Sequence, residues 1–245
     1  MINLVIDIGN SRTKIALFNQ HDLMFNVPID RLTASHVLKL KEDYPQLNKV
    51  ILSSVKPYDD ELKRVLSDEF DQFIELDHLT ELPIENLYET PETLGKDRIA
   101  AAVGANELFP DQNLLIIDAG TAITYDLVSE KNQFIGGNIS PGLEMRFKAL
   151  NHFTGKLPLV NYSDDFEPVG RNTIDAIRAG VQNGILFEIA QTIDLFNRNY
   201  QNLHIIMTGG DSYFFDKKLN YSIFVHFNLT LIGLNRILEH NAKKK

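Results

Sequence analysis

One local pattern occurs twice in the chain and constrains its fold more than any other feature. An apolar stretch ends in an aspartate, a short turn of small or polar residues follows, and a second, alternating apolar stretch completes the pattern. Each copy is typical of two strands joined by a tight turn with an acid at the tip. Two such hairpins far apart in the sequence predict two similar domains that face each other. The copies span residues 4–18 and 114–128, and one constant offset matches Asp7 with Asp118, Gly9 with Gly120 and Thr13 with Thr124.

The turns of both hairpins have the composition of an anion-binding site. Glycine lets a backbone approach a ligand closely, and consecutive N–H groups in a tight turn form a concave donor site for phosphate. Asp7 and Asp118 stand where strands end, so their carboxylates are placed to hold cations that neutralise phosphate. Two ordinary hairpins with polar turns are the alternative, and the matched positions argue against it. Further donors in the two turns are Asn10, Ser11, Thr13, Lys14 and Thr121.

The composition of the chain excludes several classes of function. Its 245 residues are enough for one large or two small domains. It contains no cysteine, which excludes disulfides, thiolate metal sites and a cysteine nucleophile. The formal net charge of −9 argues against binding to nucleic acids or to anionic membranes. We find neither a secretion signal nor an apolar stretch of about 18 residues, and therefore expect a cytoplasmic protein.

Hydrophobic periodicity predicts an α/β fold with two domains, residues 1–110 and residues 111–245, which divide near Pro110. Outside the hairpins the pattern predicts strands at 23–27, 49–55, 73–76, 134–139 and 203–207, and helices at 31–43, 59–70, from 94, at 142–150, 170–200 and 229–240. Two glycine-containing turns, residues 136–142 and 208–211, follow or interrupt predicted strands, where ligands of open α/β sheets bind.

The segment 94–105 begins with a charged Gly-Lys-Asp-Arg sequence and continues as a helix rich in small residues. Asp97 could accept a proton from a hydroxyl group, and Arg98 could bind a carboxylate through two hydrogen bonds. From the spacing alone, an ordinary acid at a helix start with a surface arginine beside it is the favoured alternative. Farther along, either Asn172 or Thr173 is expected to cap the long predicted helix.

Five motifs in order over nearly the whole chain resemble the type III pantothenate kinase family. Each motif alone is weak, and the five together are quite specific. The resemblance implies the actin, sugar-kinase and Hsp70-like fold, a pair of ribonuclease-H-like domains with ATP in a central cleft. It also implies ATP-dependent phosphorylation of pantothenate to 4'-phosphopantothenate, the first step of coenzyme A biosynthesis. The motifs are Asp7 to Lys14, Gly95 to Arg98, Asp118 to Thr124, Gly136 to Gly142 and Thr208 to Asp211.

The resemblance also implies a role for individual residues. It makes Asp97 the acceptor of the pantothenate hydroxyl proton, which reverses the preference from spacing. It assigns a monovalent cation, potassium or ammonium, to Asp118, and the family members are homodimers. Mg²⁺ is expected at Asp7, through water, because this ion dehydrates reluctantly. The ATP phosphates are expected on Asp7, Ile8, Gly9, Asn10, Ser11, Arg12, Thr13, Lys14 and Thr121, and pantothenate on Tyr88, Gly95, Lys96, Asp97, Arg98 and Thr173, in part from the partner subunit.

One residue departs from the family pattern, and other functions remain open. Ser11 stands where threonine is more usual, and it keeps the hydroxyl donor. The alternatives are another small-molecule kinase of the same superfold, acting on a sugar or acetate, and a non-catalytic nucleotide-binding regulator. A regulator need not keep Lys14, Asp97 and Arg98, and a purely structural protein leaves both acid-tipped turns unexplained.

Overall fold

The computed structural model describes residues 2–10 and 12–242, so the predicted phosphate contact Ser11 lies outside the described residues. Contacts between Cα atoms divide the chain into two compact units. Unit 1 comprises residues 1–111, 131–135 and 228–245, and unit 2 comprises residues 112–130 and 136–227. Each unit combines separate stretches of the chain, so the units do not test the predicted domains 1–110 and 111–245, which stay a prediction.

Unit 1 contains a five-stranded mixed sheet with the order β3-β2-β1-β4-β5. The first three strands are antiparallel neighbours, and β4 and β5 run parallel to β1. Parallel neighbours bring the carboxyl ends of β1, β4 and β5 to one edge of the sheet. The strands are β1 (Ile2–Ile8), β2 (Thr13–Asn19), β3 (Asp22–Ile29), β4 (Leu47–Ser54) and β5 (Gln72–Glu75).

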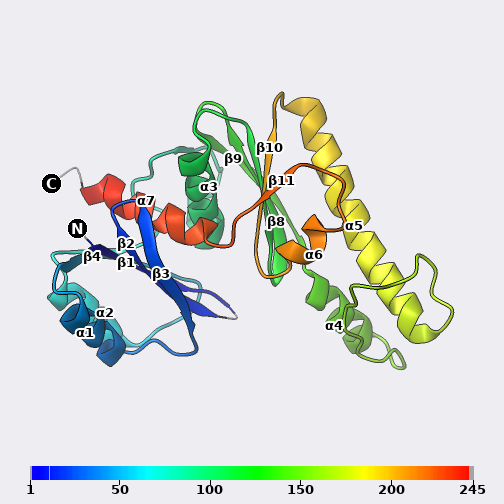
Figure 1. Ribbon diagram of the computed structural model, residues 1–245, viewed down its shortest axis with the longest axis horizontal. Helices are drawn as coiled ribbons and strands as arrows, with labels where there is room; N and C mark the ends of the chain where they lie inside the picture. Colours follow the sequence, from blue (N-terminus) through cyan, green and yellow to red (C-terminus); the bar gives the residue numbers. More distant parts are fainter. Residues whose placement is uncertain (1, 11, 243–245) are drawn as a thin grey trace. The chain divides into compact units, whose positions relative to one another are not determined.

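Helices cover both faces of this sheet (Figure 1). Helices α1 (Ala34–Asp43) and α2 (Asp60–Glu69) share an apolar core with alternate residues of β1, including Leu4, Ile6 and Ile8. On the other face, α7 (Leu229–Ala242) contacts β1 and β4, and α3 (Lys96–Leu108) contacts β4. The alternation of strand side chains therefore directs Asp7 away from the core of α1 and α2 and toward the side of α3 and α7.

The two helices α3 and α7 pack closely because each has a glycine at the contact. A Cβ atom added at Gly104 would lie 2.1 Å from the carbonyl oxygen of Leu229, and one at Gly233 would lie 1.7 Å from that of Ala100. No larger side chain fits at either position while the helices keep this separation. The C-terminal helix is thus fixed within unit 1, although more than a hundred residues separate α7 from α3.

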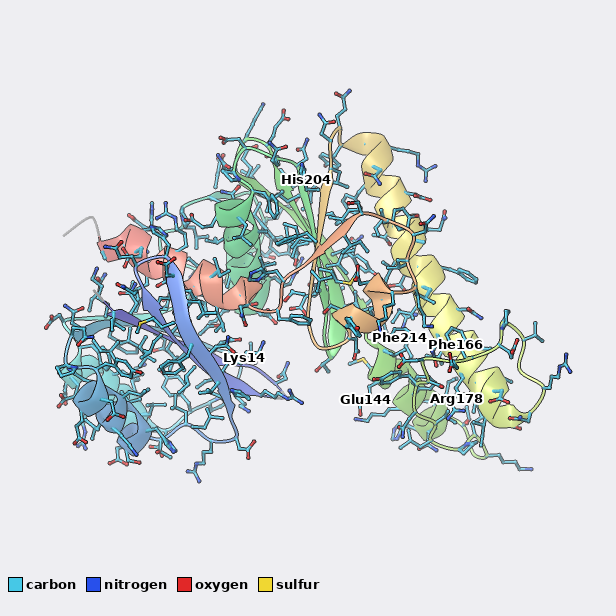
Figure 2. The ribbon with its side chains drawn as sticks, viewed as in Figure 1. Lys14, Glu144, Phe166, Arg178, His204 and Phe214 are labelled. Carbon is cyan, nitrogen blue, oxygen red and sulfur yellow. The ribbon has the colours of Figure 1, made fainter. Side chains whose placement is uncertain are left out.

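Unit 2 is built on the strand order β11-β10-β7-β8-β9. Strands β7 and β8 are antiparallel, and β10 runs parallel to both β7 and β11. The apolar core combines residues of β7, β8, β10 and β11 with α4, α5 and α6, among them Phe214, which is labelled in Figure 2. The elements are β7 (Leu114–Ala119), β8 (Ala122–Ser129), β9 (Gln133–Pro141), β10 (His204–Thr208), β11 (Ile223–Val225), α4 (Leu143–Phe153), α5 (Thr173–Asn199) and α6 (Ser212–Asp216).

The mixed α/β class is confirmed, and so is each predicted strand and helix, with bounds that shift by a few residues. Four short elements were not predicted: β6 (Glu85–Asn86), the 3₁₀ helix Pro91–Thr93, α6 and β11. Between the predicted strand 73–76 and the helix predicted from 94, β6 pairs in parallel with the start of β9. Among the described residues, no helix has both the length and the apolar character needed to cross a membrane.

Candidate active site

Asp7 lies at the carboxyl end of β1, on the sheet face that α3 and α7 cover. Asn3 marks the same face four residues earlier, because its side-chain amide donates a 2.9 Å hydrogen bond to Asn235 of α7. In the antiparallel pairing of β1 with β2, Lys14 is the direct partner of Asp7. Figure 2 shows Lys14 on β2. A cation therefore stands beside the acid on the same face of the sheet.

The electrostatics of Asp7 join the first hairpin to the start of α3. Burial raises the pKa of the Asp7 carboxyl from 3.8 to about 6. The positive charge of Lys14 opposes this rise, and the negative charge of Asp97 adds to it. The structure thus brings together three residues that the sequence separates, Asp7, Lys14 and Asp97. Two acids and one lysine at a strand end form a site that favours an additional cation.

The turn of the first hairpin is tight and presents polar groups to solvent. The backbone N–H of Gly9 donates a 3.0 Å hydrogen bond to the carbonyl oxygen of Arg12. A Cβ atom at Gly9 would lie 3.1 Å from that oxygen, so the turn has little room for a side chain there. Asn10 and Arg12 are exposed, whereas Ile8 and Thr13 are buried. Asn10 and Arg12 are therefore available to a ligand, and Ile8 can contribute through its backbone.

At the start of α3, Asp97 is exposed in the first helical turn. One oxygen of its carboxylate accepts a 2.9 Å hydrogen bond from the backbone N–H of Arg98. A Cβ atom at Gly95 would lie 2.6 Å from that same oxygen, so glycine is what leaves room for the carboxylate. Asp97 is thus held at the helix start with its carboxylate accessible, the arrangement that a base acting on a bound hydroxyl needs.

Arg98 and Tyr88 lie beside each other. The Arg98 guanidinium lies 5.5 Å from the centre of the Tyr88 ring, and that ring lies 6.1 Å from the ring of Phe134. Arg98 is 6% exposed, which is unusual for an arginine and typical of one with a fixed orientation. The predicted substrate residues Tyr88, Gly95, Asp97 and Arg98 therefore come from two segments that meet in unit 1.

Lys96 is the first residue of α3. It lines a pocket of about 390 Å³ together with Ser54 at the end of β4, Glu75 at the end of β5 and Lys63 of α2. Burial would raise the pKa of Glu75, yet its bonds to Lys63 and Tyr58 and the charges of Lys63 and Lys96 hold that pKa below its usual value. Lys96 thus contributes positive charge to a pocket at the same sheet edge as Asp7.

In the second hairpin, Asp118 lies at the end of β7 and pairs with Thr124 of β8. The Gly120 N–H donates a 3.1 Å hydrogen bond to Ala122, and Thr121 is exposed at the tip of the turn. The carbonyl oxygen of Thr121 accepts a 3.1 Å hydrogen bond from the N–H of Gly142, the residue before α4. The turn is therefore fixed to the start of a helix while its threonine side chain remains accessible.

The pairings of the two hairpins differ by one residue. Thr13 pairs with Ile8, whereas Thr124 pairs with Asp118 itself. The match of Thr13 with Thr124 at a constant offset is therefore wrong as a structural equivalence, because the first turn holds one residue more. Asp7 and Asp118 remain equivalent, each being the last residue but one of its strand.

The glycine turn after β10 closes over Asp118. Gly209 has a φ of +94°, and a Cβ atom there would lie 2.6 Å from an oxygen of the Asp118 carboxylate and 2.4 Å from the carbonyl oxygen of Ala119. The backbone N–H of Asp211 donates a 3.0 Å hydrogen bond to that carbonyl. Burial, and then the charge of Glu144, raise the pKa of the Asp211 carboxyl. The residues of this turn place peptide groups and a second acid near the second hairpin.

Both acids fit a cation, although neither belongs to a preformed metal cluster. The described residues contain no group of three or more His, Asp or Glu side chains that could hold a metal ion. Asp7 is partly buried and has another acid near it, so a cation held through water would relieve its desolvation. Asp118 lies among backbone groups of two turns, and a monovalent cation takes carbonyl oxygens readily. Either ion would need further oxygens from water or phosphate.

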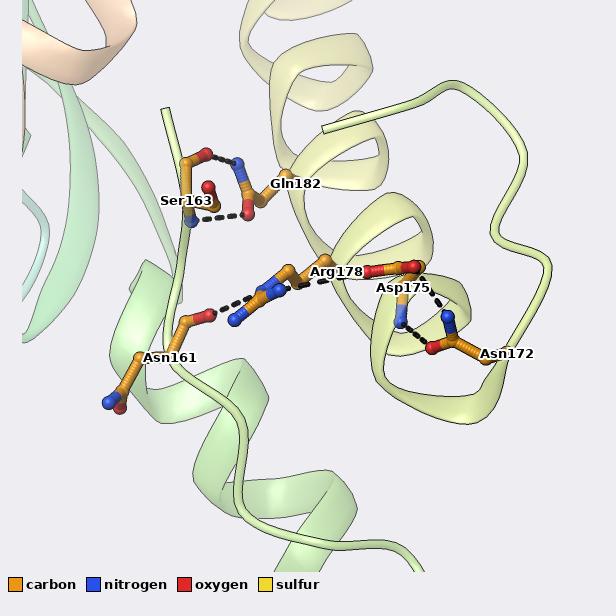
Figure 3. Close-up of polar contacts among 6 residues, drawn as sticks. All are labelled: Asn161, Ser163, Asn172, Asp175, Arg178 and Gln182. Carbon is orange, nitrogen blue, oxygen red and sulfur yellow. Dashed lines mark hydrogen bonds and ion pairs between the residues drawn. The ribbon is translucent and has the colours of Figure 1, made fainter. Parts of the chain in front are cut away.

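The start of α5 is fixed by a polar network in unit 2 (Figure 3). Asn172 is the N-cap, accepting a 3.0 Å hydrogen bond from the Asp175 N–H, so the cap is Asn172 and not Thr173. Arg178 donates to the carbonyl oxygen of Asn161, and Gln182 exchanges two hydrogen bonds with the backbone of Ser163. These bonds attach the preceding segment to α5.

Thr173 is exposed, and it lines an apolar groove of about 870 Å³ between α4 and α5. Exposed apolar side chains such as Phe153 and Ile174 lie on the same two helices. The groove is much larger and more apolar than the pockets of unit 1. An apolar face of this kind, with a polar side chain in it, is typical of a surface that meets another protein chain.

Two features near the site were missed by the sequence analysis. Ser53 of β4 is the parallel partner of Asp7, and the only sequence signal is a serine pair that ends an apolar strand. In unit 2, Glu188 accepts hydrogen bonds from Tyr125, at 2.9 Å, and from Arg146, at 2.5 Å. Arg146 also bonds Ser140 of β9, so this network joins β8, β9, α4 and α5 behind the second hairpin. Nothing in the local sequence indicates it, because its members are far apart.

The chain is similar to known proteins both in sequence and in structure. A family model described as type III pantothenate kinase matches residues 3–195. A type III pantothenate kinase of Phocaeicola vulgatus is 44% identical over 242 residues, covering 99% of this chain and 100% of that protein.

Two solved structures share the fold. A Baf family transcriptional activator of Campylobacter jejuni has a TM-score of 0.63 at 24% identity, covering 98% of this chain and 99% of that one. A glucokinase from an Antarctic psychrotroph has a TM-score of 0.53 at 12% identity, covering 98% and 99%. At these identities the likeness shows a common fold, that of the sugar kinases, and carries no information on activity.

Proposed function

This chain belongs to the type III pantothenate kinase family, and from that premise we propose how its own residues carry out the reaction. The activity is the ATP-dependent phosphorylation of pantothenate to 4'-phosphopantothenate, the first step of coenzyme A biosynthesis. Phosphoryl transfer depends mainly on positioning and on neutralising charge. The residues that matter are therefore those that orient the alcohol, bind the phosphates and hold cations.

Asp97 acts as the base for the pantothenate hydroxyl. This assignment is supported by the exposed Asp97 carboxylate, which the backbone N–H of Arg98 fixes at the start of α3. The charge of Asp97 also raises the pKa of Asp7, so the two carboxylates lie near each other. The hydroxyl oxygen attacks the γ-phosphorus in line with the leaving ADP, the bond to ADP breaks, and the proton passes to Asp97. Proton transfer late in the reaction suits a carboxylate as the base.

The ATP phosphates bind to the first turn, and Thr121 of the second turn contributes. Asn10, Arg12 and Lys14 supply side-chain donors, and Ile8, Gly9 and Thr13 supply the backbone around them. Asp7 holds a divalent cation, Mg²⁺, through water. A bound divalent cation supplies charge neutralisation at the β- and γ-phosphates. What supports the assignment is the buried acid at a strand end beside a lysine and a second acid.

Asp118 holds a monovalent cation, potassium or ammonium. The carboxylate lies beside the Gly209 turn, whose backbone comes close to it. Such an ion adds positive charge without the tight octahedral geometry that Mg²⁺ demands. Asp118 is thus the residue expected to determine which monovalent cation supports turnover.

Pantothenate is oriented by Tyr88, Gly95, Lys96 and Arg98, with Thr173 reaching the substrate in the partner subunit of a homodimer. Tyr88 and Arg98 contact each other, which gives the substrate an aromatic surface and a guanidinium in a fixed relation. The exposed position of Thr173 and the apolar groove around it support a dimer formed through α4 and α5. The cytoplasmic location belongs to the same proposal, because ATP is the co-substrate.

The proposal is tested by measuring ADP release with ATP and Mg²⁺, with and without pantothenate, in potassium and then in sodium buffer. We expect release that requires pantothenate and is several-fold faster in potassium. Release with a sugar or with acetate in place of pantothenate would favour the other kinases of this fold. Nucleotide binding without pantothenate-dependent release would favour a regulator, and equal rates in both salts would remove the role of Asp118.

A further inference from the structure

Ser53 occupies the position beside Asp7 on the neighbouring strand. In the parallel pairing of β1 with β4, Asp7 is the partner of Ser53 and Ile8 is the partner of Ser54. The pairing continues past the strand end, because the Val55 N–H donates a 3.1 Å hydrogen bond to the Ile8 carbonyl. Partners in a parallel sheet direct their side chains to the same face. The Ser53 hydroxyl therefore lies on the face that carries Asp7.

The core residues of β4 confirm this orientation. Val50 and Leu52 belong to the apolar core that α1 and α2 cover, so Ser53, the next residue, points to the opposite face. That face carries Asp7, its partner Lys14 and, close enough to influence the Asp7 charge, Asp97 of α3. Four polar side chains from β1, β2, β4 and α3 thus gather at one end of this sheet face.

The Ser53 hydroxyl is buried and has no hydrogen-bond partner. Ser53 is 1% exposed, and its Oγ atom is among the few buried polar side-chain atoms of the described residues that make no bond. The adjacent Ser54 behaves in the ordinary way, because its hydroxyl donates a 2.5 Å hydrogen bond to the carbonyl oxygen of Lys56. Buried hydroxyls in proteins nearly always have a partner, so an unpaired one needs a reason. A partner that arrives with the ligand is the reason that its location suggests.

We propose that Ser53 is a positioning residue whose hydroxyl hydrogen-bonds the Asp7 carboxylate, or the water that this carboxylate holds, when the divalent cation and nucleotide are bound. The inference rests on the proposed role of Asp7 and extends it to a second strand. An acid that holds a hydrated cation needs a fixed direction for its oxygens, and outer hydrogen-bond partners supply that direction. Because the Ser53 hydroxyl has no hydrogen-bond partner within the fold, it can donate to the Asp7 carboxylate or to its water when the ligand binds.

This role and a structural role make opposite predictions for Ser53→Ala. If the serine stabilises the fold, its loss lowers the unfolding temperature and leaves cation binding unchanged. If the hydroxyl is a donor kept for the ligand, alanine removes a buried polar group that has no partner, so the unfolding temperature stays the same or rises. Binding of the cation with the nucleotide then weakens.

The experiment measures binding of Mn²⁺, as a probe of the divalent site, to the full-length chain in the presence of ADP, by the loss of the free-ion electron paramagnetic resonance signal. For Ser53→Ala we expect about tenfold weaker Mn²⁺ binding, the lower end of the effect of outer-shell partners. We also expect an unfolding temperature at or above that of the parent and an unchanged KM for pantothenate. Ser54→Ala, the matched control, keeps parental Mn²⁺ binding and unfolds at a lower temperature.

A third variant, Asp7→Asn, separates failure of this inference from failure of the proposed function. Loss of Mn²⁺ binding in Asp7→Asn, with parental binding in Ser53→Ala, would overturn the role of Ser53 alone. Parental binding in Asp7→Asn would overturn the role of Asp7 and the inference with it. Weaker binding in Ser53→Ala accompanied by a lower unfolding temperature would also contradict the inference, because a structural role then explains both.

Discussion

The two hairpins share a plan and differ in what surrounds the acid. In the first hairpin Asp7 faces a lysine across the strand pair and a second acid from α3. In the second hairpin Asp118 faces a threonine and lies under a glycine turn. The first acid therefore has a lysine and another acid near it, whereas the second lies against the backbone of a glycine turn that also carries Asp211. Charged neighbours suit a strongly charged ion with its own water, whereas peptide oxygens suit a weakly charged ion that sheds water readily.

A repeated motif can therefore keep the position of its acid on the strand while the chemistry around that acid diverges. Both acids are the last residue but one of a strand. They differ in neighbours that the motif does not contain, Asp97 in one case and Gly209 in the other.

The largest effect is expected at Asp97, the acid at the start of α3 whose charge acts on Asp7 of the first hairpin. Asp97→Asn removes the proton acceptor and keeps the size of the side chain, so turnover should fall by about 100-fold or more, the range for acid–base groups. Binding of ATP should be nearly unchanged, which isothermal calorimetry can check. Glu61→Gln, at an exposed acid in the first turn of α2, is the control and should keep parental turnover. Parental turnover in Asp97→Asn would remove the residue from its role.

Beside the second hairpin, stability is expected to depend most on Gly209, in the turn that packs against Asp118. Gly209→Ala should lower the free energy of unfolding by roughly 3 kcal/mol, because φ is unfavourable for alanine and the methyl group meets backbone and carboxylate oxygens. Gly210→Ala, where a Cβ atom meets nothing within 4 Å, is the matched control and should change stability little. Urea denaturation of both variants measures the difference. Equal stability of the two variants would mean that a side chain at position 209 has room beside Asp118.

The pH dependence of stability distinguishes Asp7 from an ordinary surface acid. Burial raises its pKa to about 6 from 3.8, so the folded chain binds this proton more tightly than the unfolded chain does. The contribution of Asp7 to the free energy of unfolding therefore falls as pH rises through the range between these two values. Asp7→Asn lacks that fall and should be more stable than the parent above this range, by on the order of 2 kcal/mol.

The measurement is urea denaturation in EDTA at several pH values from acid to neutral. The advantage of Asp7→Asn should disappear at the acid end, where the Asp7 carboxyl is protonated in both states. A variant that is less stable than the parent at neutral pH would show that Asp7 is not desolvated in the folded chain.

The smallest effect is expected for the hydrogen bonds among Tyr125, Glu188 and Arg146 behind the second hairpin. Tyr125 is buried, and its hydroxyl donates to Glu188. Tyr125→Phe should lower the free energy of unfolding by about 1 kcal/mol, because Glu188 keeps its bond to Arg146. The exposed Tyr162, changed to Phe, serves as the control in the same denaturation series. No loss at Tyr125 would mean that Arg146 alone fixes the carboxylate.

The sequence was sufficient for the elements with long, regular patterns. The alternation in residues 4–18 and 114–128 predicted both hairpins, and the glycine-flanked helix starts predicted α3 and α4. Short elements such as α6 and β11 were missed, because five or three residues carry no measurable period. The one-residue difference between the hairpins was also missed, because a constant offset in sequence does not count residues within a turn.

The site was predictable where its residues form one motif and unpredictable where they meet through the fold. Tyr88 and Arg98 were proposed from the family resemblance, and the structure brings them together. Ser53 could not be recognised, because its importance comes from a parallel pairing between strands that are not adjacent in sequence. The packing of α7 within unit 1 depends on glycines in two distant helices and has no local signal either.

The most direct test of the account is whether the two acids serve different ions. Pantothenate-dependent ADP release is measured for Asp7→Asn and Asp118→Asn while Mg²⁺ and potassium are each varied in turn. We predict that Asp7→Asn needs about tenfold or more Mg²⁺ with an unchanged potassium requirement, whereas Asp118→Asn loses the advantage of potassium over sodium and keeps its Mg²⁺ requirement. Equal shifts in both requirements for either variant, or the reverse assignment, would contradict the account.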